Sequence, residues 1–75
     1  MGIDERRERE RSKRLEAIVE AAWQVAEQLG WSAFSVERVA AHAELGRATI
    51  YSYFVSIDEL VVEMAKRALE DLRAR

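Results

Sequence analysis

The apolar positions along the chain recur in four groups, and the first group runs from Leu15 to Leu29 with the i, i+3, i+4, i+7 spacing of an amphipathic helix. Gly30 follows the last apolar residue, where a left-handed residue can end a helix without a Cβ clash. The pattern therefore predicts a first helix over about residues 12–29. Its apolar members are Leu15, Ile18, Val19, Ala22, Trp23, Val25, Ala26 and Leu29.

A short connection containing Trp31 and Phe34 follows, and we expect both rings to pack as core beside Trp23. Ser35 occupies the position of an N-cap, because its hydroxyl can accept a hydrogen bond from a free amide of the next turn. A second helix is predicted over 36–43. Its apolar face is formed by Val36, Val39, Ala40 and Ala43.

The residues Glu44, Leu45 and Gly46 interrupt the helical spacing, and a new apolar set predicts a third helix over 47–54. Ser56 and Glu59 then form a Ser-x-x-Glu capping box, which indicates the start of a fourth helix over 57–75. Its apolar stripe consists of Leu60, Val61, Met64, Ala65, Ala68, Leu69 and Leu72.

A chain of 75 residues without proline or cysteine and with one histidine favours one small all-α domain. It offers no disulfide framework, no cluster of metal ligands and no nucleophile–base pair, so we expect neither a cofactor nor a metal nor enzymatic activity. No apolar run approaches the roughly 18 residues that a membrane span needs. We therefore expect a cytoplasmic protein with no membrane partner.

Charge is distributed unevenly along the chain. Its 12 Lys and Arg residues and 14 Asp and Glu residues give a net charge of -2, whereas nucleic-acid binders tend to be basic. Residues 1–14 contain six basic and four acidic residues and are locally positive. Residues 1–11 lack apolar periodicity, so they form either a flexible charged arm or an extension of the first helix; we favour the mobile arm.

The second and third predicted helices have the spacing of a helix-turn-helix from about Val36 to Phe54, in which the second helix enters a major groove. Small Ala40 lets the two helices approach closely. The predicted fold is thus a three-helix, homeodomain-like bundle over 12–56, followed by the start of a linking fourth helix. The buried contacts of this unit are expected from Val39, Ala43, Leu45, Ile50 and Tyr53.

The stretch from Ala17 to Leu60 resembles the DNA-binding domain of the tetracycline-repressor (TetR) family. The family pattern joins a first helix ending in Gly, a helix led by Ser or Thr, a Thr-Leu-Tyr-x-Tyr/His-Phe motif and an acidic-hydrophobic helix start. The matching segments are Leu29-Gly30, Ser35-Val36-Glu37-Arg38-Val39-Ala40, Thr49-Ile50-Tyr51-Ser52-Tyr53-Phe54 and Ser56-Ile57-Asp58-Glu59-Leu60.

The resemblance implies a repressor that binds a palindromic operator in double-stranded DNA at the nucleoid and is a homodimer when full-length. It also implies release by a small molecule held in a second helical domain. Because residues 57–75 resemble the linking helix, we expect an isolated or truncated reading domain. Such a fragment is expected to be weakly dimeric or monomeric and to bind no small-molecule ligand.

The family match places one set of residues toward the DNA bases: Gly46, Arg47, Ala48, Tyr51 and Ser52. Arg47 is the best single candidate for reading a base, and its alternative role is that of a solvated turn charge. The match places Thr49 and Tyr53 where phosphate contacts occur. Tyr51 and Tyr53 are alternatively core aromatics that keep a polar tip.

Residues outside the third helix also point toward phosphates. Ser35 begins the second helix, where free amides and the helix dipole attract anions, with Arg38 beside it; capping alone is the alternative for Ser35. Lys13 and Arg14 are expected to contact the backbone or the minor groove, or to be solvated.

Three departures from the family pattern bear on the expected binding. Glu44 replaces the usual turn glycine, so the turn either avoids a left-handed residue there or carries a strain of roughly 1 kcal/mol. Ile57 replaces a lysine that commonly contacts phosphate, and Glu37 and Glu44 add negative charge near the interface, so we expect weaker and less salt-dependent binding. The acidic balance and the apolar stripe of the fourth helix alternatively fit a small helical protein-interaction or dimerisation module without DNA binding.

Overall fold

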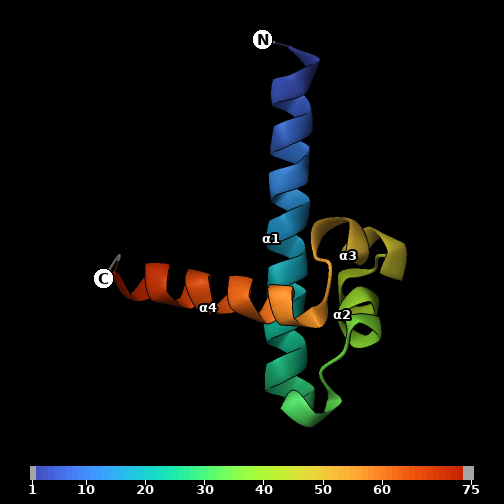
Figure 1. Cartoon of the computed structure of the whole chain (residues 1–75), viewed down its shortest axis with the longest axis vertical. Coiled ribbons are helices and arrows are strands. Elements are labelled where there is room, and N and C mark those ends of the chain that lie inside the picture. Colours follow the sequence, from blue (N-terminus) through green and yellow to red (C-terminus); the bar gives the residue numbers. More distant parts are fainter. Residues whose placement is uncertain (1, 74–75) are drawn as a thin grey trace.

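The computed structural model describes residues 2–73, and every regular element in this range is helical. In chain order the elements are α1 (Ile3–Leu29), the 3-10 turn η1 (Trp31–Ala33), α2 (Val36–Ala43), α3 (Arg47–Tyr53) and α4 (Ile57–Arg73). The predicted all-α helix-turn-helix fold is confirmed. Figure 1 shows long α1 as the spine of the molecule, with α2 and α3 against one side and α4 crossing it steeply.

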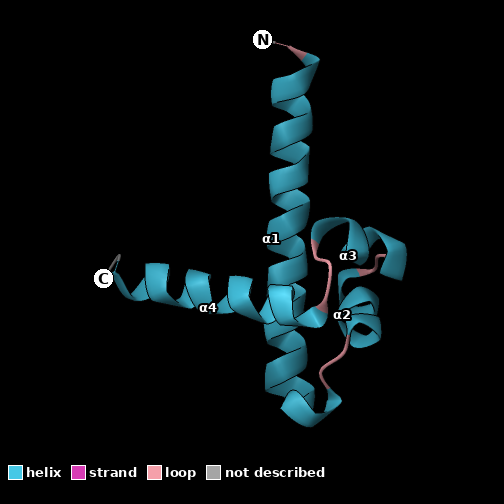
Figure 2. Ribbon diagram, viewed as in Figure 1, coloured by secondary structure: helices cyan, strands magenta, loops and turns pink. Residues whose placement is uncertain are grey.

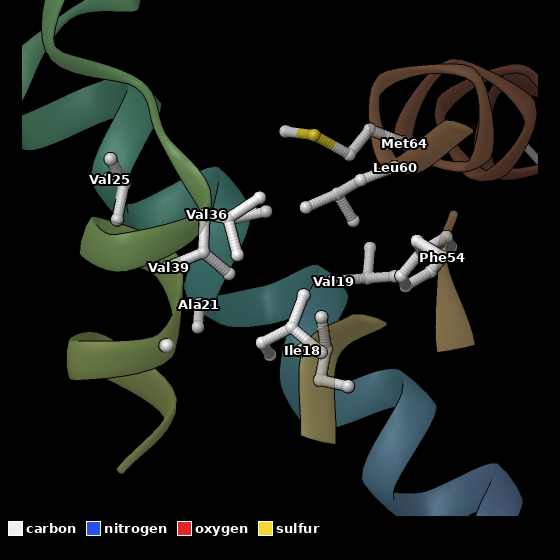
Figure 3. Packing of buried hydrophobic residues seen from close by; sticks show 12 residues of the cluster. Ile18, Val19, Ala21, Val25, Val36, Val39, Phe54, Leu60 and Met64 are labelled. Carbon is white, nitrogen blue, oxygen red and sulfur yellow. The ribbon is translucent and has the colours of Figure 1, made fainter. Parts of the chain in front are cut away.

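A single apolar cluster joins the four helices (Figure 3). Helix α1 supplies the largest share, and α3 supplies only Ile50, which is 1 % exposed. Trp23, Phe34 and Ile57 pack at the edge of this cluster. The buried residues are Ile18, Val19, Ala21, Ala22, Val25, Val36, Val39, Ala40, Ile50, Phe54, Leu60 and Met64.

Helix α1 begins much earlier than the sequence pattern predicts. Residues 3–11, expected as a mobile arm, form its first turns; residue 1 lies outside the described residues. Arg and Glu are good helix formers, and these turns extend an existing helix, which avoids the unfavourable nucleation step. An exposed pair between Arg6 and Glu10, with Nε and Oε1 3.4 Å apart, adds a small contribution.

The connection after α1 differs from its predicted packing. Trp31 remains 57 % exposed rather than joining the core, and its ring lies against that of Phe34 with centroids 5.0 Å apart. Trp31 begins the turn η1 immediately after Gly30, and this connection between α1 and α2 lies at the end of the bundle (Figure 2). Phe34 alone of this pair reaches the cluster.

Gly30 ends α1 with a φ of 81° and a ψ of 165°. This is not the left-handed helical conformation expected from the sequence but an extended region that essentially only glycine adopts. Its amide donates to the Ala26 carbonyl at 3.1 Å. The position therefore requires glycine for its backbone angles and not for lack of space, since an added Cβ would meet no atom within 4 Å.

Replacing Gly30 with alanine is expected to lower the free energy of unfolding by about 1–3 kcal/mol, because alanine cannot adopt this conformation without strain. Gly46→Ala is the matched control: its Cβ also meets open space, but its φ is -78°. Thermal unfolding followed by circular dichroism compares the two variants. Equal melting temperatures for both would contradict the strain at Gly30.

Both predicted N-caps are present. The backbone amide of Arg38 donates to Oγ of Ser35 at 3.2 Å, at the start of α2. At the start of α4 the amide of Glu59 donates to Oγ of Ser56 at 3.5 Å. The return bond of the capping box is displaced by one residue, because the carboxylate of Glu59 accepts from the amide of Val55 at 2.8 Å rather than from Ser56.

Candidate nucleic-acid interface

The turn between α2 and α3 sets the angle at which α3 leaves the bundle. Glu44 adopts the left-handed conformation, with φ 57° and ψ 40°. The amide of Leu45 donates to the Ala40 carbonyl at 2.9 Å and that of Glu44 to Ala41 at 3.2 Å, which together form a Schellman cap. Glu44 thus adopts a backbone conformation that glycine usually adopts at this position of a helix cap.

Glu44→Gly is expected to raise the free energy of unfolding by up to about 1 kcal/mol, because it relieves the clash that a Cβ makes in the left-handed region. Chemical denaturation measures the change. Glu44→Gln serves as the control, since it removes the charge but keeps the Cβ. If the glutamine variant gains as much as the glycine variant, the charge and not the backbone is the cause.

Helix α3 presents its polar side to solvent. Ile50 faces the core, whereas Tyr51 is 49 % exposed. All five residues predicted to face bases are exposed, so the structure brings them together on and beside the outer face of α3: Gly46, Arg47, Ala48, Tyr51 and Ser52. Ser52 turns its hydroxyl back to donate to the Thr49 carbonyl at 2.6 Å. The exposed face is therefore mixed in polarity, with Arg47 as its cation.

Arg47 forms an ion pair with Glu37 of α2. Its Nη1 lies 2.9 Å from Oε1 of Glu37, and both side chains are more than half exposed. The pKa of Glu37 is lowered by a hydrogen bond from its own backbone amide and then by the hydrogen bond from Arg47. The carboxylate is therefore ionised at neutral pH, and the pair is lost only as the pH falls through that lowered pKa.

The residues predicted to contact phosphates lie around this face. Thr49 and Tyr53 both belong to α3, and the Tyr53 ring packs at the edge of the core. The hydroxyl of Ser35 accepts the capping bond from the Arg38 amide, and it also donates toward the Glu37 carboxylate, which contributes to the lowered pKa of Glu37. Arg38 is exposed one turn along α2.

The two basic residues predicted near the start of the first helix are exposed on α1 and lie beside the helix-turn-helix. Lys13 and Arg14 line a hollow that Ala43 and Leu45 close from the other side. Arg14 also lines a second hollow together with Tyr53. Both hollows lie between α1 and the helix-turn-helix, so α1 adds cations at the edge of the α3 face.

Two further arginines belong to this region, although the sequence-based prediction did not include them. Arg7 and Arg11 line the same hollow as Arg14 and Tyr53, and the guanidinium carbon of Arg11 lies 4.3 Å from the centroid of the Tyr53 ring. The sequence does contain a signal for them, the i, i+4, i+7 spacing of Arg7, Arg11 and Arg14. This spacing places the three side chains on one face only if residues 3–11 are helical.

Over residues 2–73 no helix is long and apolar enough to cross a membrane. The same range contains no group of three or more His, Cys, Asp or Glu side chains arranged to hold a metal ion. The arrangement that the structure does provide is an exposed, polar helix supported by a bundle, with cations on both sides.

Comparison with protein families finds a match to the model described as bacterial regulatory proteins, tetR family, over residues 18–64. This span covers the second half of α1, the complete helix-turn-helix and the beginning of α4. Neither a search of curated proteins nor a search of solved structures returns a match. Because the family model covers more than half of the chain, this chain belongs to the tetR family of bacterial regulatory proteins.

Proposed function

We propose that this chain binds double-stranded DNA sequence-specifically, as the operator-reading domain of a TetR-like transcriptional repressor acting at the cytoplasmic nucleoid. The observation that carries the proposal is the exposed outer face of α3, which the buried side chain of Ile50 anchors to the core. The chain also belongs to a family of bacterial regulatory proteins. Helix α3 enters the major groove and Arg47 reads a base edge, because a guanidinium can donate two parallel hydrogen bonds to guanine.

The remaining predicted residues fix the position of α3 on the duplex rather than its sequence preference. Hydroxyl groups and the amides of helix N-termini commonly contact phosphates. Ser35 and Arg38 flank α3 on the side of α2, and Arg14 flanks it on the side of α1, where it lines a hollow with Tyr53 of α3. Two such sets of contacts hold the recognition helix from both sides.

The intact regulator is proposed to bind a palindromic operator as a homodimer, because a two-fold pair places two recognition helices one helical turn of DNA apart. Helix α4 supports this arrangement through apolar residues that the bundle does not cover. Val62, Leu69 and Leu72 are 52 %, 60 % and 66 % exposed. An apolar surface of this kind commonly marks a contact with another domain or chain.

The same α4 residues are the specific observation in favour of the rival function, a helical protein-interaction or dimerisation module. Sedimentation analysis with and without duplex DNA separates the two functions. A chain that self-associates through α4 but shows no affinity for any duplex at low salt is an interaction module. A chain that binds duplex as a monomer is a DNA reader.

Selection from a randomised duplex library tests the proposed function itself. We expect enrichment of a short motif and weak binding by the single domain, because one recognition helix lacks the second half-site contact of a dimer. If the library shows no enriched motif at low salt, while the chain remains folded by circular dichroism, sequence-specific reading is wrong.

A further inference from the structure

The first turns of α1 carry a row of arginines on the side that faces α3. Arg7, Arg11 and Arg14 are spaced i, i+4 and i+7, so they lie on one face of the helix. Ile18 continues the same row by one further turn and is buried in the core. The face is therefore directed toward the bundle, and α1 itself projects past α3 toward the N-terminus (Figure 1).

Tyr53 joins this row to the recognition helix. The guanidinium of Arg11 lies over the Tyr53 ring at 4.3 Å from its centroid, within the distance of a cation–π contact. Arg7, Arg11, Arg14 and Tyr53 line one open hollow together with Glu10. The contact fixes the direction of the arginine row relative to α3.

The charge of the hollow is positive. Glu10 is its one acidic lining residue, and the carboxylate of Glu10 is paired with Arg6 at 3.4 Å. Within residues 2–73, no hydrogen bond or ion pair engages the guanidinium groups of Arg7, Arg11 or Arg14. Arg7 and Arg14 are thus free to bind an anion, and Arg11, which stacks on the Tyr53 ring, keeps its N–H groups available to donate.

We propose that Arg7, Arg11 and Arg14, together with Tyr53, form a second contact surface for the phosphate backbone of duplex DNA, the arginine face of α1. The inference rests on the proposed function, since the ligand of the arginine face is the same DNA duplex that α3 reads. A row of exposed cations over two helical turns can contact successive phosphates of a DNA backbone. Because Tyr53 of α3 lines the same hollow, a duplex bound at α3 can continue along this row.

This surface is a feature of this chain beyond the part that it shares with its family. The family match begins at residue 18, whereas all three arginines precede it. The arginine face also compensates for Glu37 and Glu44, which lie at or next to the α3 face and repel phosphate. In a chain with a net charge of -2, it concentrates positive charge where the duplex passes.

A rigid helix is a better phosphate contact than the mobile arm that the sequence pattern favours. The arginines of a flexible arm lose backbone and side-chain freedom on binding, and that ordering reduces the affinity. In α1 the backbone is already helical and Arg11 is already held against Tyr53. Only side-chain adjustments remain when the duplex arrives.

The test is the salt dependence of duplex binding by the double variant Arg7→Ala/Arg11→Ala. Each phosphate contact contributes about 0.9 to the slope of log K against log of the salt concentration. We expect the variant to reduce the slope by about 2 and the affinity near 0.1 M salt by on the order of 10-fold. The loss should be equal for a selected duplex and a scrambled one, because phosphate contacts do not read sequence.

Arg9→Glu is the matched control. It changes the net charge by the same two units, but residue 9 is turned about 200° from Arg7 around the helix, because each residue turns an α-helix by about 100°. We expect at most half of the change in slope for this control. Circular dichroism confirms that both variants keep α1 helical, which alanine and glutamate both favour.

Each outcome bears on a different claim. If the wild-type chain binds duplex and the double variant has the slope of the control, the arginine face is wrong while the proposed function stands. If the wild-type chain binds no duplex at low salt, both are overturned. If the double variant loses affinity for the selected duplex only, the arginines read sequence and the phosphate assignment is wrong.

Discussion

Replacing Ile50 with alanine is expected to lower the free energy of unfolding by about 2–5 kcal/mol, the range for truncating a buried Ile or Leu. Ile50 is 1 % exposed and is the one buried residue of α3. For a domain of this size, a loss of 1 kcal/mol lowers the melting temperature by roughly 4–8 °C. The variant should therefore melt about 8–40 °C lower or fail to fold, as thermal unfolding followed by circular dichroism would report.

Leu69→Ala provides the comparison for that measurement. It removes a side chain of similar size from α4, but Leu69 is 60 % exposed, so its effect should stay within about 0.5 kcal/mol. If Ile50→Ala melts within a few degrees of Leu69→Ala, α3 is not anchored through Ile50. The orientation of its outer face would then need another explanation.

Arg47→Ala is expected to relax the base preference of the chain at one position of its site and to weaken binding to the selected duplex by about 5- to 150-fold. That range corresponds to the 1–3 kcal/mol of discrimination that one bidentate arginine–guanine contact provides. Binding to a scrambled duplex should change much less. Parallel titrations of the two duplexes measure both effects.

Glu37 is expected to modulate this contact, because its carboxylate holds Nη1 of Arg47 at 2.9 Å in the free chain. Binding to a base must share or replace that ion pair. Glu37→Gln should therefore tighten binding in the wild-type background by more than it does in the Arg47→Ala background. Equal effects in both backgrounds would mean that Glu37 acts only by repelling phosphate, and that the ion pair has no role in reading.

The helix pattern after the start of α1 was predictable because each apolar group has one clear period and the boundaries between residues 29 and 57 carry local signals. Ser35 and Ser56 are caps whose hydrogen bonds depend on residues three positions away. The ends of α2 and the start of α3 follow from such signals. The boundaries of the helix-turn-helix are thus encoded locally, whereas its packing depends on the distant residues of α1 that share the apolar cluster with Ile50.

The departures from prediction depend on contacts between distant residues or on backbone details. The helical state of residues 3–11 carries no apolar signal, and its tie to the rest of the fold is the contact between Arg11 and Tyr53. The ion pair of Arg47 and Glu37 joins two helices whose relative angle the sequence pattern does not specify. Trp31 shows the same limit, because an aromatic residue in a connection packs only where another element covers it.

The central claim is that α3 reads bases from the major groove, and a 7-deazaguanine scan of the selected duplex tests it most directly. This substitution replaces N7, one of the two acceptors that guanine presents in the major groove, and leaves O6 and the minor groove unchanged. We predict that one position or more loses about 10-fold in affinity for the wild-type chain, and that Arg47→Ala shows no such loss at the position it reads. If the chain prefers the selected duplex over a scrambled one, yet no 7-deazaguanine substitution in it lowers the affinity, major-groove reading by α3 is contradicted.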